Sequence, residues 1–300
     1  MNVEIRDSRF RDVVGDDAPL ERLGTGFKFV EGAVWNHARR NLIFSDMPGD
    51  VMRVWTPDGR IETFRRPSGM ANGSCYDRQG RLVTCEHATS RVTRTGLDGK
   101  LTVLASHYEG KELNSPNDVV VKSDGATYFT DPSFGRMEYY GVPRKQELEF
   151  QGVFRLDPEM KELSLLVSDF VQPNGLCFSL DEKRLFVNDT MKGHIRVFDV
   201  DDAGGLVNGR VWAEVKGPGD GVPDGLKIDS ASNLFSAGPG GIHVFAPDAT
   251  SLGVIHTPEN VGNLTFGGPD WSTLFIAAST TVWALDTLTR SAPVPNMMRV

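Results

Sequence analysis

One short phrase recurs six times along the chain, and this repetition restricts the fold more than any other feature. Each copy places an Asn, Asp or Glu at the start of an apolar run, often with Gly directly after it. The copies are "VEGAVW", "MANGSCYD", "SPNDVVVK", "QPNGLCFS", "VPDGLKID" and "VGNLTFGG". Their polar residues are Glu31, Asn72, Asn117, Asn174, Asp224 and Asn263, and successive positions lie 41, 45, 57, 50 and 39 residues apart. Such intervals are typical of a four-stranded propeller blade, which takes roughly 40–50 residues.

Further β-type segments follow each copy in the same order. A second strand is predicted in segments such as "NLIFSD" and "RLFVND", a third in "GHIRVFDVDD", and a weaker fourth in "KLTVLAS". Turn pairs such as "DG" separate them, which indicates strands joined by hairpins. A β-sandwich and a linear repeat are the alternative folds, and six matched phrases argue against both.

The two ends of the chain complete this pattern. The sixth unit ends with "TTVWALDTLTR" and has no clear fourth strand, whereas "PLERLGTGFKF" precedes the first unit and can supply one. Chain ends that meet in one blade would close the ring and remove an open sheet edge. We therefore predict an all-β fold, a six-bladed β-propeller whose ring is closed by an N-terminal strand in the last blade. Residues 1–300 are expected to form this single domain.

Composition excludes several classes of partner. The net charge is -8 and the sequence pI is about 5.3, which argues against nucleic acid and anionic membrane, since both require basic surface. No run of eighteen apolar residues predicts a membrane span, and the charged first twenty residues lack the apolar stretch of a signal peptide. The three cysteines, Cys75, Cys85 and Cys177, show no CxxC spacing. Reduced thiols and a cytoplasmic location are expected.

The six polar residues are expected to meet in one place. The first strand of each propeller blade lines the central channel, so equivalent positions form a ring at one depth. This ring would hold two carboxylates and four carboxamides, and Ca²⁺ prefers such oxygen ligands. Soft metals are disfavoured because the ring contains no Cys or His. The alternative is a hydrogen-bonded polar plug that holds buried water.

Five phrases in this order resemble a known family. They are "EGAVW", "SPNDVVV", "YFTDPSFG", "QPNGLCFS" and "VPDGLKID". Together they make the chain similar to the gluconolactonase / senescence marker protein (regucalcin) / luciferin-regenerating enzyme family, and most of all to its bacterial gluconolactonase-like branch. The resemblance covers nearly the whole chain from about Glu31 onward, and it implies a six-bladed propeller with one divalent metal ion in the channel.

The resemblance also implies which ring members bind the metal. Carried over motif by motif, the ligands are Glu31, Asn117, Asn174 and Asp224. Asn72 and Asn263 are then expected beside the metal or on its water. Ca²⁺ is the favoured ion, and Zn²⁺, Mg²⁺, Mn²⁺ and Fe²⁺ are the alternatives that members of the family accept.

Residues that contact substrate carry over less completely. The resemblance places Asp118 and Asp131 toward substrate hydroxyls, and Asn72 and His87 are further candidates on the same rim. The animal branch of the family has an arginine where this chain has Ser115, so its sugar specificity does not transfer. The long interval before the fourth phrase contains "SFGRMEYYGVPRKQELEF", which is expected to form either a lid over the channel, spanning residues 133–150, or a solvated loop.

The resulting functional prediction is hydrolysis of a sugar-acid lactone, a small-molecule substrate, by a gluconolactonase-like lactonase. A metal-polarised carbonyl would be attacked by water, with Asp224 as the general base, a role that comes from the resemblance. No G-x-S-x-G nucleophile elbow is present, which disfavours a serine acyl-enzyme. The alternatives are an esterase or phosphotriesterase of related propeller type, and a non-catalytic calcium-binding propeller.

Overall fold

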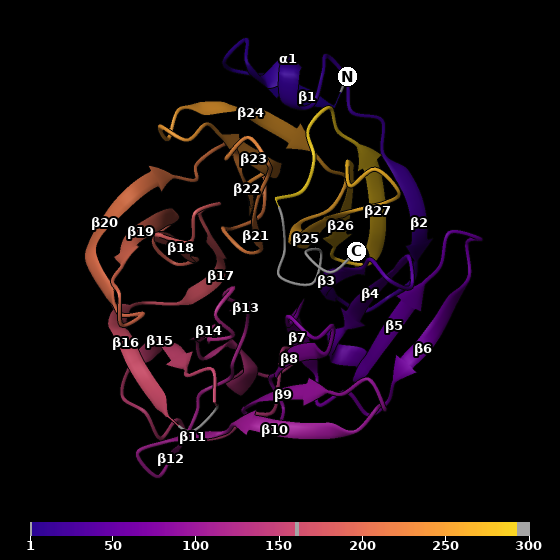
Figure 1. Cartoon of the computed structure of the whole chain (residues 1–300). Helices are drawn as coiled ribbons and strands as arrows, with labels where there is room; N and C mark the ends of the chain where they lie inside the picture. The colour runs from indigo at the N-terminus through magenta and orange to yellow at the C-terminus, as the bar shows by residue number, and fades with distance from the viewer. Residues whose placement is uncertain (1, 160–161, 293–300) are drawn as a thin grey trace.

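The computed structural model describes residues 2–159 and 162–292, and it confirms the predicted fold class. Six antiparallel β-sheets stand around a central axis, each running outward from an inner strand to the rim (Figure 1). The inner strands of neighbouring sheets pack side by side around the whole circle, including the last against the first. We refer to the sheets as blades 1 to 6 in chain order of their inner strands.

Blades 1 to 4 each consist of four consecutive strands. Blade 1 contains β3 (Val30–Asn36), β4 (Asn41–Asp46), β5 (Val51–Trp55) and β6 (Ile61–Arg65). Blade 2 contains β7 (Ala71–Tyr76), β8 (Leu82–Glu86), β9 (Arg91–Thr95) and β10 (Leu101–Ala105). Blade 3 contains β13 (Val119–Val121), β14 (Thr127–Asp131), β15 (Gln151–Leu156) and β16 (Leu163–Phe170). Blade 4 contains β17 (Pro173–Phe178), β18 (Arg184–Asp189), β19 (His194–Val200) and β20 (Leu206–Glu214).

The last two blades each recruit a strand from the N-terminal part of the chain. Blade 5 contains β21 (Leu226–Ile228), β22 (Leu234–Gly238), β23 (Gly241–Phe245) and β24 (Ser251–His256), with β1 (Val3–Ile5) as a fifth strand at its edge. Blade 6 contains β25 (Val261–Gly267), β26 (Thr273–Ala278) and β27 (Thr281–Asp286), and β2 (Glu21–Thr25) completes it antiparallel to β27. The predicted closure by an N-terminal strand is therefore confirmed, whereas β1 was not foreseen.

Short elements join these sheets. They are α1 (Phe10–Val13), the 3-10 helices η1 (Met47–Gly49) and η2 (Phe134–Arg136), and the hairpin of β11 (His107–Tyr108) with β12 (Lys111–Glu112). Phe10 and Val13 of α1 are buried against blades 5 and 6. The helix thus seals the outer edge at which the N-terminal strands leave one blade and enter the next.

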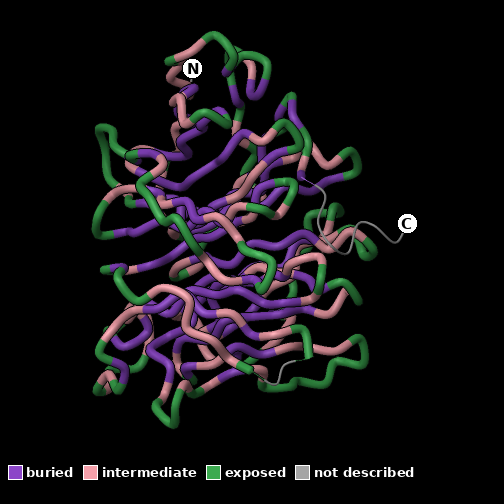
Figure 2. The backbone as a smooth tube through the Cα atoms, turned by 60° about the vertical axis from the view of Figure 1, so that its left-hand side comes forward, coloured by how far each residue is buried: buried purple, intermediate pink, exposed green. Residues whose placement is uncertain are grey.

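The hydrophobic core is divided among the interfaces between blades. Six apolar clusters occur in the described residues, each between two neighbouring blades. Between blades 6 and 1, for example, the ring of Trp35 stacks on that of Phe275 with centroids 5.0 Å apart. Buried residues accordingly fill the interior of the molecule, and exposed residues lie in the outer turns and along outer strands such as β10 and β20 (Figure 2). Burial of apolar surface at about 25 cal/mol per Å² makes each interface dependent on both of its blades.

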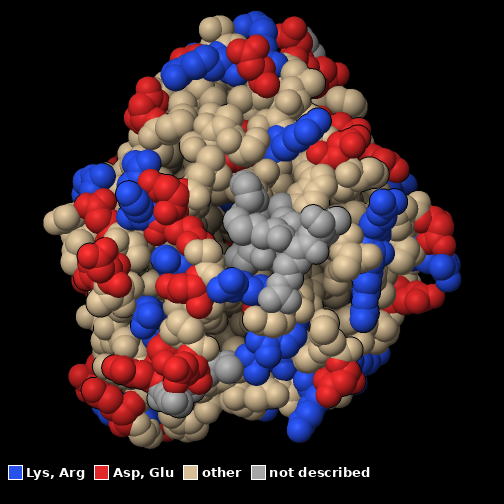
Figure 3. Space-filling model, viewed as in Figure 1, with Lys and Arg blue, Asp and Glu red and all other residues tan. Residues whose placement is uncertain are grey.

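The surface charges, the helices and the cysteines add three observations. On the face shown in Figure 3, acidic and basic side chains alternate around the rim rather than forming one basic patch. Within residues 2–159 and 162–292, no helix is long and apolar enough to cross a membrane. Cys75, Cys85 and Cys177 are all free thiols.

Candidate active site in the channel

The structure brings the six predicted polar residues together at the entrance of the inner strands. Glu31, Asn72 and Asn174 are each the second residue of an inner strand, whereas Asn117 and Asp224 each stand two residues before one. Glu31 and the four asparagines are at most 4% exposed. Asp224 is partly exposed. Each inner strand therefore contributes one oxygen-bearing side chain to a single level of the channel, which we call the ring.

Hydrogen bonds to backbone carbonyls help to fix the ring because they link neighbouring blades. The Gly73 amide donates to the Asn117 carbonyl at 2.7 Å, and the Gly225 amide donates to the Gly262 carbonyl, also at 2.7 Å. The Thr130 hydroxyl donates to the Asn174 carbonyl at 2.8 Å. Each of these contacts joins two neighbouring blades at the point where the inner strands converge on the axis.

Convergence also explains the glycine that follows several ring residues. A Cβ on Gly32 would collide with the Asn72 carbonyl, and one on Gly175 would collide with the Asp224 carbonyl. Gly32 additionally has a φ of 57°, in the left-handed region that glycine adopts without strain. The phrase "polar residue, then Gly" is thus required by strands that meet at close range.

Two carboxylates of the ring, the buried Glu31 and the partly exposed Asp224, lie close enough for their charges to interact. Burial raises the pKa of Glu31, and burial together with the nearby Glu31 charge raises the pKa of Asp224. Asp118 acts on both in the same direction. Neither Glu31 nor Asp224 has a Lys, Arg or His ion-pair partner among the described residues. Lys227 forms no ion pair with Glu31, although its positive charge opposes the rise in the Glu31 pKa. Two like charges held close together without an ion-pair partner favour either a bound cation or a shared proton.

Four carboxamides complete the ring, and most of their amide groups are already engaged. Asn72 and Asn117 both direct their amide nitrogens to Nε2 of His87, at 3.1 and 3.4 Å. The Asn174 amide donates to the Thr190 hydroxyl at 3.1 Å. Because the nitrogens are occupied, oxygen is the atom that these side chains can offer to a ligand. Asn263 differs, since its oxygen accepts from the Leu264 amide at 2.9 Å.

His87 supports this arrangement from outside the ring. Its Nε2 accepts from two carboxamides, and its Nδ1 donates to the Tyr140 carbonyl at 2.8 Å. Both nitrogens of the neutral imidazole are therefore hydrogen-bonded, and burial lowers the pKa of His87 to about 4. This geometry favours a role in orienting Asn72 and Asn117 over the direct substrate contact expected from sequence.

The His87 arrangement predicts how stability depends on pH. Because the folded pKa of about 4 lies below the ordinary value of 6.5, the unfolded chain takes up the proton first as pH falls. The stability that neutral His87 contributes is complete above about pH 6.5 and is lost toward pH 4. From the size of this shift, about 3 kcal/mol of unfolding free energy should disappear.

Denaturant unfolding of the wild type and of His87→Gln across this pH range measures the effect as the difference between the two curves. His107→Gln is the matched control, because His107 is exposed. A wild-type-to-His87→Gln difference that does not change with pH would contradict the prediction.

Asp118 and Asp131 occupy different surroundings. Asp118 is buried with its Oδ1 accepting from the Val119 amide at 2.9 Å, while its Oδ2 has no partner. Asp131 is fully buried, and both of its oxygens accept backbone amides, from Asn114 and Ser115, each at 2.8 Å. Asp131 thus holds the loop that leads into Asn117. Its contacts favour a positioning role over the substrate contact that the resemblance implied.

The excursion between β14 and β15 reaches back across the channel entrance. Besides the contact of its Tyr140 carbonyl with His87, its Tyr139 hydroxyl donates to the Lys28 carbonyl at 2.9 Å, and the rings of Tyr140 and Phe29 meet edge to face at 5.5 Å. The segment therefore links blade 3 to blades 2 and 1 on the side where the inner strands begin. For residues 133–150, these contacts fit the predicted lid better than a solvated loop. We call this segment the Tyr140 strap.

Tyr140 is a site residue that sequence reasoning did not single out. Burial raises its pKa, and the negative charges of Tyr139, Asp224 and Glu31 act in the same direction. Its side chain thus stands close enough to the ring for both ring carboxylates to affect it. Only its place in the unusually long interval before the fourth phrase could have pointed to it.

The ring fits a divalent cation on the chemistry of its donors. Glu31 and Asp224 supply two negative charges that have no ion-pair partner, and Asn117 and Asn174 supply carboxamide oxygens. Hard cations such as Ca²⁺ accept this set. In the part of the chain that the structure describes, no three His, Cys, Asp or Glu side chains converge to hold an ion by themselves. A site for soft metals is therefore not offered by these residues.

Comparison with known proteins agrees with the fold and identifies the family. Residues 29–280 match the model of the SMP-30/gluconolactonase/LRE-like region. The chain belongs to this family. It is similar to the gluconolactonase of Zymomonas mobilis, with 34% identity over 305 residues that cover 94% of this chain and 85% of the relative. The pentonolactonase of Haloferax volcanii is 25% identical over 265 residues, covering 85% and 83%.

Solved structures of the family superpose closely on this one. A gluconolactonase from Xanthomonas campestris aligns with a TM-score of 0.89 and 36% identity, over 96% of this chain and 95% of that one. Family membership and the shared fold cover nearly the whole chain, including all six blades.

Proposed function

We propose that this chain is a metal-dependent lactonase that opens a sugar-acid lactone of the aldonolactone type to its acid. The ring carries the proposal, because it combines two interacting carboxylates that have no ion-pair partner with carboxamide oxygens at one level of the channel. Membership in a family whose relatives include gluconolactonases supports the reaction class. An enzyme is favoured over a binding protein because both carboxylates of the ring are present.

The proposed cation would be held by Glu31, Asn117, Asn174 and Asp224, with Ca²⁺ the favoured ion. When bound, such an ion supplies a Lewis acid that polarises the lactone carbonyl and stabilises the developing oxyanion. Asn263 is assigned to orienting Glu31, since its amide lies against that carboxylate and its oxygen is occupied.

Asp224 is proposed as the proton acceptor. It is the ring carboxylate that is partly exposed, so water and substrate can reach it. In the proposed step its carboxylate takes a proton from the water whose oxygen bonds to the carbonyl carbon. That proton then passes to the endocyclic ester oxygen of the lactone as the acyl C–O bond breaks. The products are the free acid and the hydroxyl group of the opened chain.

Substrate hydroxyls would be bound at the entrance side of the ring. Asn72 and the Tyr140 hydroxyl are assigned to these contacts, while His87 and Asp131 are assigned to holding the surrounding loops. Asp118, which lies behind the ring with one unpartnered oxygen, is assigned an electrostatic role rather than the hydroxyl contact expected from sequence.

A lactone panel tests the proposal. Protein stripped with a chelator is given Ca²⁺, Zn²⁺, Mg²⁺ or Mn²⁺ in turn, and acid release is followed in a pH-stat on gluconolactone, xylonolactone and an aryl ester. Cation-dependent opening of at least one lactone, above the spontaneous rate, is the expected result. Turnover of the aryl ester alone would assign the chain to the esterase-type propellers. Cation binding with no turnover of any substrate would indicate a non-catalytic binding protein.

A further inference from the structure

A second site lies deeper in the channel, beyond the ring. The inner strands continue past the ring residues, and their next residues line a cavity of about 360 Å³. No ring residue is among its lining residues. Because the Tyr140 strap lies where the inner strands begin, this cavity is on the opposite side of the ring. It is therefore distinct from the proposed lactone site.

The cavity wall is mainly apolar. It is formed by side chains from the inner strands and the turns that follow them, among them Val34, Val119, Val121, Phe178, Leu180 and Phe266. Apolar cavities of a few hundred Å³ with few polar groups are typical of small-molecule sites. The wall thus predicts a ligand whose body is hydrocarbon, which a polyhydroxylated sugar lactone is not.

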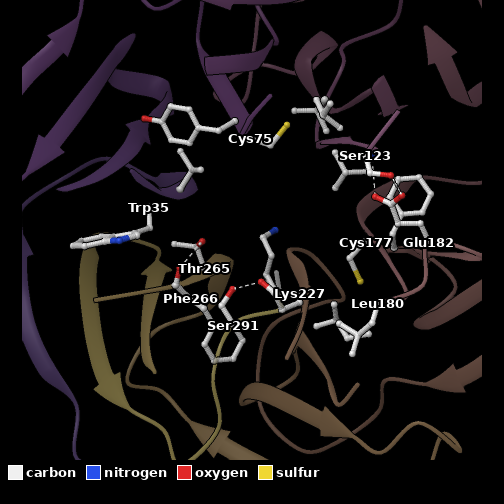
Figure 4. Close-up of a pocket in the computed structure, with 18 of the residues that line it drawn as sticks. Trp35, Cys75, Ser123, Cys177, Leu180, Glu182, Lys227, Thr265, Phe266 and Ser291 are labelled. Carbon is white, nitrogen blue, oxygen red and sulfur yellow. Dashed lines mark hydrogen bonds between the residues drawn. The ribbon is translucent and has the colours of Figure 1, made fainter. Parts of the chain in front are cut away.

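One positive charge projects into this apolar space. The Lys227 side chain points to the middle of the cavity, between the walls that carry Cys75 and Cys177 (Figure 4). Its Nζ donates to the Leu226 carbonyl at 3.1 Å. No carboxylate of a described residue comes within 4.0 Å of Nζ. An ammonium has three donors, so Lys227 retains hydrogen-bonding capacity toward a ligand.

The acidic residues near the cavity are held by other partners or stand apart. Glu182 at the rim accepts from the Ser123 amide at 2.8 Å and pairs with Lys122 at 3.5 Å. Asp181 accepts from the Ser179 hydroxyl at 2.6 Å. Asp118 and Glu31 interact with Lys227 electrostatically, but neither forms an ion pair with it. An incoming anion therefore does not have to displace a protein carboxylate from Lys227.

We propose that this cavity binds a small monocarboxylate with an apolar body, its carboxylate on Lys227 Nζ and its hydrocarbon part against the apolar wall. One ammonium matches one carboxylate, and a charge-assisted hydrogen bond in a sheltered site is stronger than a neutral one. Lys227 is the one Lys or Arg side chain among the described lining residues, and Asp181 and Glu182 also belong to the lining, so a dianion is disfavoured. The site would be occupied independently of the cation in the ring.

Calorimetric titration of the full chain with octanoate and with 1-octanol tests the proposal, since the two ligands share a chain and differ in charge. Lys227→Met keeps a side chain of similar length and removes the ammonium. We expect octanoate to bind the wild type and to lose at least ten-fold in affinity on Lys227→Met, while 1-octanol changes less than about two-fold. Lys216→Met is the matched control, because Lys216 is an exposed lysine paired with Glu214 on the surface.

Three outcomes would overturn the proposal. They are no octanoate binding by the wild type, equal loss of octanoate and 1-octanol on Lys227→Met, and the same loss of octanoate on Lys216→Met. Thermal unfolding of each variant shows whether the fold is retained. The lactone panel is a separate measurement, so failure of one proposal leaves the other standing.

Discussion

Replacing Asp224 with Asn is expected to lower kcat/KM for lactone opening by about 10²–10⁴-fold, the range that a positioned general base contributes. The carboxamide keeps the shape of the side chain and one oxygen donor, but it cannot accept the proton of the attacking water. Because the change also removes the repulsion that Glu31 exerts at this position, the variant should fold at least as well as the wild type when no cation is present.

The assay pairs steady-state kinetics with a titration of the cation on the same samples. Asp220→Asn is the matched control, since Asp220 is an exposed carboxylate four residues earlier on the same segment. Retained cation binding with lost turnover supports the base role. Undiminished turnover by Asp224→Asn would reject it.

Cation binding should stabilise the fold strongly, and Glu31 should be required for that effect. A ligand present at about one hundred times its dissociation constant stabilises the state that binds it by about 2.7 kcal/mol. In the wild type, chelation is expected to remove this stabilisation. In Glu31→Gln one of the two negative charges is lost, so added cation should stabilise the fold far less. With chelator present, the variant should be more stable than the wild type, because a buried carboxylate that has no ion-pair partner has been removed.

Denaturant unfolding with chelator and with each cation measures these four states. Glu182→Gln serves as the control, because Glu182 is a partly buried carboxylate that already has Ser123 and Lys122 as partners. Equal stabilisation of the wild type and Glu31→Gln by every cation would exclude Glu31 as a ligand.

Much of the fold could be predicted from the sequence because the repeat has a physical cause. Four of the six ring members are followed by Gly, and the close approach of neighbouring strands at Gly32 and Gly175 shows why. The missing last strand predicted β2 in blade 6, since an open edge would otherwise remain. By contrast, β1 is a short strand of polar and apolar residues beside a complete blade, and no periodic signal distinguishes it from a loop.

The candidate site was less completely predictable. The sequence indicates which residue types enter the channel, but not which of their atoms are already bonded. His87 and Asp131 could be recognised as polar residues near the ring, whereas their engagement by carboxamides and backbone amides depends on loops from other blades. Tyr140 reaches the ring from an irregular excursion that has no counterpart in the other repeats. Lys227 follows Asp224 by three residues, and only the cavity around it distinguishes it from a surface lysine.

Closure of blade 6 by β2 has a consequence for how the protein folds during its synthesis. Strand β2 cannot pair with β27 until residue 281 has been synthesised, because Thr25 pairs with Thr281. The fold therefore depends on contacts of very long sequence separation. Every blade contributes a side chain to the ring, so an incomplete nascent chain cannot assemble the site. Until β27 has been synthesised, blade 6 is incomplete and inner strands present unpaired apolar faces, which is the condition under which chaperones are needed. Acquisition of cation binding would therefore report completion of the circle rather than folding of any one blade.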